Sequence, residues 1–179
     1  MLKATDVADF FVYLMQEEEN ELTNLKLNKL VYFAQGHSLK RYGRPLFSDD
    51  IQAWKHGPVV ADVYHKFKGY QRHPITEVPP TFGLSKYSED EKTLLVDVAR
   101  EYGRFTGQAL RNMTHQADTP WSRVYDPEKK STVIRISDIR EYFDKQPGIE
   151  LGEIDFPDDA FIGYRDSDGY LVLPSEYDD

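Results

Sequence analysis

The stretch from Asn24 to Arg41 constrains the fold most, because it is apolar on nearly every side of a helix. One stripe of apolar residues recurs at helical spacing, and further large apolar residues point elsewhere: Leu27, Leu30, Val31 and Ala34 on the stripe, then Leu25, Tyr32, Phe33 and Leu39. Gly43 and Pro45 then favour a helix end. A helix of this kind can bury its surface only when other elements surround it. We therefore predict a central helix.

Capping patterns predict further helices around this one. The predicted first residues or caps are Thr5 for the first helix, Pro58 for a third helix, Ser88 in a capping box with Glu91, Thr106, Pro120 and Ser137. The third helix would place Val63, Tyr64 and Phe67 on its inner face. Residues 68–87 contain so many Gly and Pro residues that we expect a long loop there.

Two segments favour β-structure. Residues 132–136 are rich in β-branched side chains, which predicts a short strand. Two apolar runs flank the turn sequence at 166–169, so a β-hairpin from about Ala160 to Leu173 is expected. The predicted fold class is mainly α: a compact multi-helix domain over residues 1–146 with a minor β element. An acidic C-terminal extension, residues 147–179, would carry the hairpin.

The charge of the chain is concentrated in that extension. Residues 147–179 hold ten acidic residues and one basic residue, Arg165, so their net charge of −9 equals that of the whole chain. Residues 1–146 are therefore formally neutral. A neutral body with an acidic extension disfavours strong binding to phosphate backbones, so nucleic acid is not the expected partner.

The sequence offers no pattern typical of a catalytic, metal or cofactor site. The chain has no cysteine, which excludes disulfides, thiolate metal sites and a cysteine nucleophile. The five histidines do not occur at metal-ligand spacing, and no phosphate-binding glycine motif or nucleophile elbow is present. We therefore expect a protein that is not an enzyme, with no cofactor and no metal. No apolar run is long enough for a membrane span, and a cytoplasmic location is expected.

Two segments stand out as candidate functional residues because each joins a tryptophan to a histidine. The candidates are Trp54, Lys55, His56, Gly57, Pro58, Val59 and Tyr64 from the first segment, and Thr114, His115, Pro120 and Trp121 from the second. One interpretation is that both tryptophans are core anchors, buried close to each other at helix starts. The other is a rigid recognition surface, because tryptophan, tyrosine and arginine dominate many protein interfaces.

At these residues the sequence resembles the Panacea domain of SocA-like antitoxins, which also occurs among phage-associated proteins. The resemblance covers roughly residues 3–145 in order. It rests on the segments Leu25–Gly36, Tyr42–Phe47, Ala53–Val59, Leu110–His115, Pro120–Trp121 and Tyr142–Phe143. Where the family usually has an aromatic residue, this chain has His56.

The resemblance implies an antitoxin that neutralises a cognate toxin by direct protein–protein binding, the toxin being encoded by an adjacent gene. A basic toxin is expected from the acidic extension. Neutralisation by occlusion and delivery of the toxin to a protease both stay open, and the oligomeric state, a homodimer included, stays open too. The alternatives are a prophage- or plasmid-linked DNA-binding regulator, with a winged-helix-like element around residues 132–136, and an enzyme built on His56 and His115.

Overall fold

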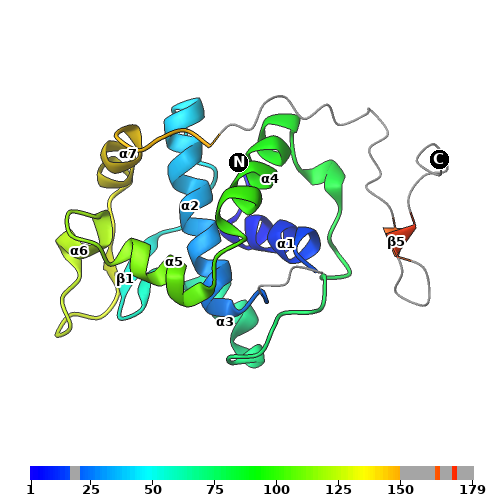
Figure 1. Cartoon of the computed structure of the whole chain (residues 1–179), viewed down its shortest axis with the longest axis horizontal. Helices are drawn as coiled ribbons and strands as arrows, with labels where there is room; N and C mark the ends of the chain where they lie inside the picture. Colours follow the sequence, from blue (N-terminus) through cyan, green and yellow to red (C-terminus); the bar gives the residue numbers. More distant parts are fainter. Residues whose placement is uncertain (17–20, 150–163, 166–170, 173–179) are drawn as a thin grey trace.

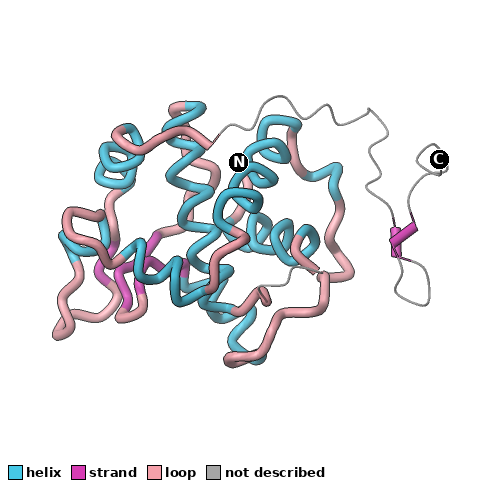
Figure 2. Tube along the Cα trace, in the orientation of Figure 1, coloured by secondary structure: helices cyan, strands magenta, loops and turns pink. Residues whose placement is uncertain are grey.

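The chain is mainly helical with a small β-sheet, as the sequence predicts (Figures 1 and 2). The computed structural model describes residues 1–16, 21–149, 164–165 and 171–172. The helices are α1 (Ala4–Leu14), α2 (Asn24–Tyr42), α3 (Ala61–Phe67), α4 (Glu89–Tyr102), α5 (Gly107–Thr114), α6 (Pro120–Val124) and α7 (Ile136–Asp144). The strands of the main sheet are β1 (Ile51–Trp54), β2 (Gly57–Val60) and β3 (Thr132–Val133).

Helix α2 is the central element, which confirms the prediction from its all-round apolar pattern. Helices α1, α3, α4, α5 and α7 and strand β2 all pack against it (Figure 1). Its first turn is capped by the Thr23 hydroxyl, which accepts from the Lys26 amide at 3.3 Å. The helix ends at Gly43, whose φ of 66° is the left-handed conformation that glycine adopts without strain.

Polar side chains of α2 bind the backbone of the irregular segments around it. The Gln35 side chain accepts from the Leu46 amide at 2.7 Å and donates to the Phe47 carbonyl at 2.9 Å. The buried Lys26 ammonium donates to the Gly103 carbonyl at 2.5 Å. These bonds satisfy backbone groups that the loops bury. The central helix therefore fixes the loops as well as the core.

The sheet has the order β2-β1-β3, with antiparallel pairing throughout. Strands β1 and β2 form a hairpin in which Trp54 pairs with Gly57, so Lys55 and His56 make a two-residue loop. The alternation of antiparallel pairs turns the backbone groups of Pro58 and Val60 away from β1 and towards α2. There the Pro58 carbonyl accepts from Lys29 at 2.8 Å, and the Val60 amide donates to Asn28 at 3.2 Å.

This arrangement corrects the prediction that Pro58 begins a helix. Pro58 lies inside β2, and α3 begins only at Ala61. A proline is tolerated on an edge strand where its missing N–H would not have joined the ladder. Val63 and Phe67 are buried on α3 as predicted, whereas Tyr64 stays 38% exposed.

Three predicted helix starts are confirmed, and the other three, at Pro58, Thr5 and Ser137, are wrong. Ser88 caps α4 in a capping box, Thr106 caps α5, and Pro120 opens α6 after the cap Thr119. Thr5, by contrast, lies inside α1, because the Asp6 carboxylate accepts from the Lys3 amide at 2.8 Å, which makes Lys3 the cap and starts the helix two residues earlier.

Ser137 likewise lies inside α7 and not at its cap. The predicted strand at 132–136 is short: β3 covers Thr132–Val133, and the Ile134 amide still donates to the Ile51 carbonyl at 2.8 Å. The Arg135 carbonyl already accepts from the amides of Asp138 and Ile139, so α7 begins at Ile136.

The long predicted loop and the C-terminal extension are described in part. Residues 68–87 hold two single-turn 3₁₀ helices, Lys68–Tyr70 and Leu84–Lys86, and are otherwise irregular. Strands β4 (Tyr164–Arg165) and β5 (Leu171–Val172) pair antiparallel. The rest of the predicted hairpin lies outside the described residues. Ile149, just past the predicted boundary at residue 146, is buried with the core.

Candidate functional site

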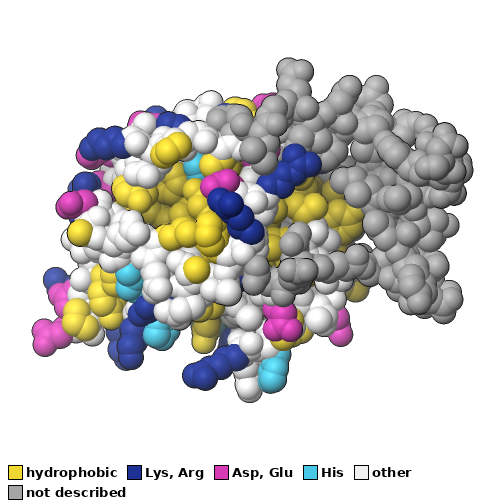
Figure 3. All heavy atoms as spheres, viewed as in Figure 1, with side chains coloured by type: hydrophobic (Ala, Val, Ile, Leu, Met, Phe, Trp, Pro, Cys, Tyr) yellow, Lys and Arg dark blue, Asp and Glu magenta, His cyan; other side chains and the backbone are white. Residues whose placement is uncertain are grey.

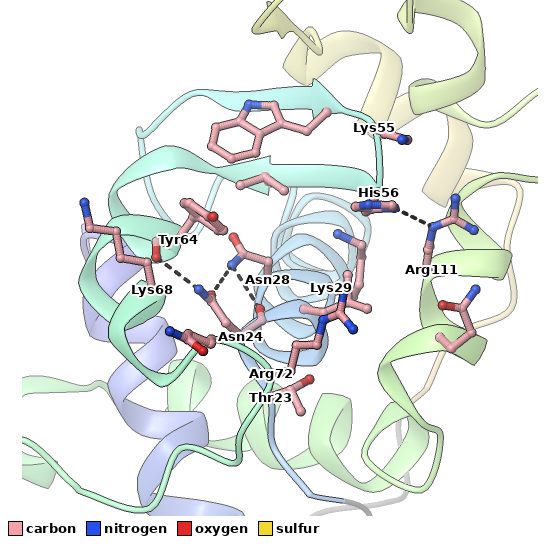
Figure 4. A pocket seen from close by; sticks show the side chains of 15 residues that line it. Thr23, Asn24, Asn28, Lys29, Lys55, His56, Tyr64, Lys68, Arg72 and Arg111 are labelled. Atoms are coloured by element: carbon pink, nitrogen blue, oxygen red, sulfur yellow. Dashed lines mark hydrogen bonds between the residues drawn. The ribbon is translucent and has the colours of Figure 1, made fainter. Parts of the chain in front are cut away.

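A cavity of about 500 Å³ opens at the N-terminal end of α2. Four segments line it: the start of α2, the β1–β2 hairpin, the α3 region with the turn after it, and α5 (Figure 4). Its volume lies within the range of small-molecule sites, roughly 300 to 1,000 Å³. The hairpin loop with Lys55 and His56 forms part of its rim.

The lining of this cavity is basic. Among the fifteen described residues that line it, none is Asp or Glu. Five are cationic: Lys29, Lys55, Lys68, Arg72 and Arg111. In Figure 3, Lys, Arg and His side chains gather at the lower edge of the molecule, near α5 and α3. The cavity therefore combines a high density of positive charge with polar amides from Asn24, Asn28, Gln71 and Gln108.

Lys29 supplies the buried charge of the cavity. Its side chain is fully buried, and its ammonium donates to the Pro58 carbonyl at 2.8 Å. Within the part of the chain that the structure describes, no carboxylate pairs with it. Burial, with a smaller contribution from the Arg111 charge, lowers the pKa of Lys29 to about 7.

Gly57 permits this close packing of the hairpin on α2. Its φ of 105° lies in the range that favours glycine. A Cβ there would meet the Lys29 Cε at 2.7 Å and the Thr114 hydroxyl at 2.8 Å. The absence of a side chain thus allows Lys29 and α5 to approach the hairpin from two sides.

His56 contacts the cavity lining through Arg111. The Arg111 Nε donates to the His56 Nδ1 at 3.2 Å (Figure 4). Burial lowers the pKa of His56, and the neighbouring charges of Arg111 and Lys55 lower it further. Because Nδ1 accepts a hydrogen bond, the neutral ring carries its proton on Nε2.

The second candidate segment, which contains His115 and Trp121, binds the backbone of the hairpin. The His115 ring contacts the Arg111 carbonyl through Nδ1 at 2.8 Å and the Lys55 carbonyl through Nε2 at 3.2 Å. The Trp121 Nε1 donates to the Trp54 carbonyl at 2.8 Å. The rings of His115 and Trp121 lie 3.7 Å apart. These contacts fix the hairpin to the corner between α5 and α6.

The prediction for the two tryptophans is confirmed only for Trp121. Trp121 is 8% exposed and is the second residue of α6, whereas Trp54 is partly buried and lies in β1. The two tryptophan-containing segments do contact each other, through the hydrogen bond from the Trp121 indole to the Trp54 carbonyl. The Trp54 ring packs on Tyr64 at 5.0 Å between centroids, and its indole N–H donates to Gln52 at 2.8 Å. Trp54 stays partly accessible because its ring, which contacts Tyr64 and His65 of α3, is not fully covered by them.

The structure divides the predicted candidates into two groups. Five line the cavity: Trp54, Lys55, His56, Val59 and Tyr64. The others shape or hold the hairpin: Gly57, Pro58, Thr114, His115, Pro120 and Trp121.

Sequence reasoning missed the residues that make the cavity basic. They are Lys29, Lys68, Arg72 and Arg111, together with the amides of Asn24 and Asn28. One signal was available: Asn28 and Lys29 are polar residues in the middle of the most apolar stretch of this helix, between Leu27 and Leu30. Arg72 and Arg111 gave no such signal, since a basic residue in a loop or on a short helix is ordinarily solvated.

A second, smaller cavity lies on the aromatic face of the molecule. It measures about 170 Å³ and is lined by aromatic residues of α2, α4 and α7, among them Phe33, Tyr102 and Phe143. Figure 3 shows hydrophobic side chains on the face where α2 runs between α7 and α4. Phe33 and Tyr102 stack at 4.1 Å, so this face is well packed.

The described residues show neither a metal-binding cluster nor a membrane-spanning helix. None of their His, Asp and Glu side chains form a group of three that could hold a metal ion. No helix among them has the length and apolar content needed to cross a bilayer.

The chain is similar to known antitoxin sequences. The family described as "Antitoxin SocA-like, Panacea domain" matches residues 27–122, which include most of α2, the hairpin, α5 and the start of α6. Antitoxin SocA of Caulobacter vibrioides (strain NA1000 / CB15N) is 50% identical over 114 residues, covering 56% of this chain and 58% of that protein. The chain thus spans less than two thirds of the length of this curated relative. No solved structure matches at a significant level. Because the family match covers more than half of the chain, the protein belongs to the family of SocA-like antitoxins with a Panacea domain.

Proposed function

We propose that the protein is the antitoxin of a toxin–antitoxin system and neutralises a cognate toxin by binding it directly. The observation that carries this proposal is the family match, which includes the hairpin and the α5–α6 corner that holds it. A stoichiometric inhibitor needs a preformed surface, because ordering a loop on binding costs affinity. Three hydrogen bonds fix the hairpin loop in place here, from Arg111, His115 and Trp121.

The surface that we propose for the toxin is the tip of the hairpin and the rim of the cavity beside it. Lys55 and His56 are exposed at its tip, and Trp54 and Tyr64 form an accessible aromatic pair beside it. Aromatic side chains next to cations are the usual anchors of protein interfaces. A tight complex would bury about 1,600 Å² in total, so the contact extends beyond the four residues.

The toxin is proposed to be basic and encoded next to this chain. The support is the segment 147–179, which carries the net charge of −9. Opposite charge speeds the encounter of two proteins, and it also competes with any attraction of the toxin for phosphate.

The test is rescue of growth. The adjacent gene is expressed alone and together with this chain, and the complex is then purified by a tag on the toxin. Toxicity alone, loss of toxicity on co-expression and a stoichiometric complex are expected. If the adjacent gene is harmless, or if no complex forms, direct neutralisation is wrong.

The surface is tested with a matched pair of variants. Trp54→Ala removes the aromatic anchor beside the hairpin tip and is expected to weaken toxin binding about tenfold or more. Arg100→Ala truncates an exposed side chain on α4, away from the hairpin, and is the control. Equal affinity of both variants would place the toxin elsewhere.

A further inference from the structure

The basic cavity has a feature that toxin binding does not explain. Five cationic side chains converge on about 500 Å³ without an acidic residue among the described lining residues. Like charges at short range destabilise a folded protein unless an opposite charge is present. In the described part of the chain, no ion pair involves Lys29, Lys55, Lys68, Arg72 or Arg111. The unpaired positive charge of the cavity therefore favours binding of an anion.

The buried position of Lys29 indicates where the anion lies. The Lys29 ammonium can donate three hydrogen bonds, and the described structure gives it one acceptor, the Pro58 carbonyl at 2.8 Å. In Figure 4, Lys29 and the guanidinium groups of Arg72 and Arg111 lie on the same side of the cavity. An ammonium and two guanidinium groups on one side form a set of donors suited to phosphate oxygens.

The opposite side of the cavity has a different character. Tyr64 lies there with the amide side chains of Asn24 and Asn28 (Figure 4). Asn28 and Asn24 are tied to each other at 2.9 Å, and Asn24 donates to the Tyr64 carbonyl at 3.0 Å, so this wall is fixed. Trp54 packs on the Tyr64 ring and also lines the cavity. An aromatic and amide wall suits the uncharged part of a small molecule.

We propose that this cavity binds a small molecule that carries several phosphate groups, with the phosphates on Lys29, Arg72 and Arg111 and the uncharged part against Tyr64 and Trp54. A polyphosphate brings several negative charges into a small volume, which matches five cations better than a peptide carboxylate does. The cavity volume suits a molecule of nucleotide size. The proposal does not depend on a toxin partner.

The experiment is titration calorimetry on the full 179-residue chain at low salt. The probes are ATP, tripolyphosphate, adenosine and a synthetic peptide of residues 147–179. Binding of ATP or tripolyphosphate, with none by adenosine, is the expected result. Tighter binding of ATP than of tripolyphosphate would identify a nucleotide, and equal binding would identify the polyphosphate group as the whole ligand.

Matched variants locate the binding. Arg111→Gln and Arg72→Gln are each expected to weaken phosphate binding about tenfold, the usual effect of losing one charged hydrogen bond. Arg100→Gln, an exposed change on α4, is expected to have no effect. Both arginine positions lie at the protein surface or in short elements, so folding is retained, which a circular dichroism spectrum checks.

Three results would overturn the proposal. One is absence of binding of either phosphate probe at millimolar concentration. Another is equal weakening by Arg100→Gln and by the two cavity variants, which would indicate a general charge effect. The third is displacement of ATP by the acidic peptide at lower concentration than by tripolyphosphate, which would make the cavity a site for the chain's own acidic segment.

Discussion

At the scale of single residues, Lys29 shows how a central helix can carry a charge into the core. It is fully buried beside Pro58, with Gly57 leaving the room for its side chain. Burying an ammonium without a carboxylate is unfavourable, and the group responds with a lowered pKa. The buried ammonium of Lys29 thus lowers the free energy of unfolding. Residues with strongly shifted pKa values of this kind cluster at functional sites.

This residue makes the stability depend on pH in a defined direction. The pKa of Lys29 is about 7 in the folded protein, below its ordinary value of 10.5. Between these values the unfolded chain binds more protons, so the free energy of unfolding rises with pH through this window. Below about pH 7 the ammonium is charged in both states and its unfavourable contribution is constant.

The measurement is urea unfolding of the wild type and of Lys29→Met at about pH 7 and about pH 9.5. The wild type is expected to gain stability relative to Lys29→Met as the pH rises. The nearby His56 titrates below this window, since its pKa is lowered, so it does not contribute to the difference. A difference between the two proteins that does not change with pH would show that Lys29 is not the titrating group.

At the scale of elements, the hairpin depends on the α5–α6 corner. Trp121 is buried and donates its indole N–H to the Trp54 carbonyl, while the Trp54 indole reaches only its neighbour Gln52. The two tryptophans therefore differ: the buried Trp121 joins two elements by a hydrogen bond, and the partly exposed Trp54 contacts α3 through its ring only.

Alanine substitution of each tryptophan should distinguish their contributions to stability. Trp121→Ala is expected to lower the free energy of unfolding by about 3 to 5 kcal/mol, because it removes a buried aromatic side chain and a hydrogen bond between elements. Trp54→Ala is expected to cost clearly less, since its ring is partly exposed. Chemical denaturation of both variants measures this. Equal losses would show that the Trp54 ring is as much a core residue as Trp121.

At the scale of the whole molecule, charge is divided between two parts of the chain. The first 146 residues are formally neutral, although they form a basic cavity, and residues 147–179 carry −9. We propose that these parts have separate roles, with the domain of residues 1–146 supplying the shape of the toxin surface and the extension supplying long-range attraction. The division of the chain after residue 146 is part of this proposal.

Neutralising the extension in the full chain tests its role. A variant with the ten acidic residues of 147–179 changed to their amides is expected to bind the toxin more slowly and more weakly at low salt. The difference from the wild type should shrink as salt is added, because salt screens charges beyond about 10 Å. The measurement is the association rate of the toxin with the wild type and with the variant at several salt concentrations. Identical rates and salt dependence would leave the extension without an electrostatic role.

The sequence by itself determined the central helix, three of the helix starts, the class of fold and the family. These depend on local patterns: apolar spacing around α2, the Ser88 capping box, and Pro120 after Thr119. Local rules failed at Pro58 and Thr5, where hydrogen bonds from distant or neighbouring side chains chose another element or another start.

Only the tertiary structure decided the candidate site. The basic cavity joins Lys29 of α2, Arg72 of the loop after α3 and Arg111 of α5, which are far apart in the chain. Arg72 and Arg111 have an ordinary sequence context, and Lys29 differs only in being a polar residue on a largely apolar helix. Their charges add up only because the hairpin, with no side chain at Gly57, packs between α2 and α5. Coulomb interactions depend on distance in space, and the spacing of residues along the chain does not contain that distance.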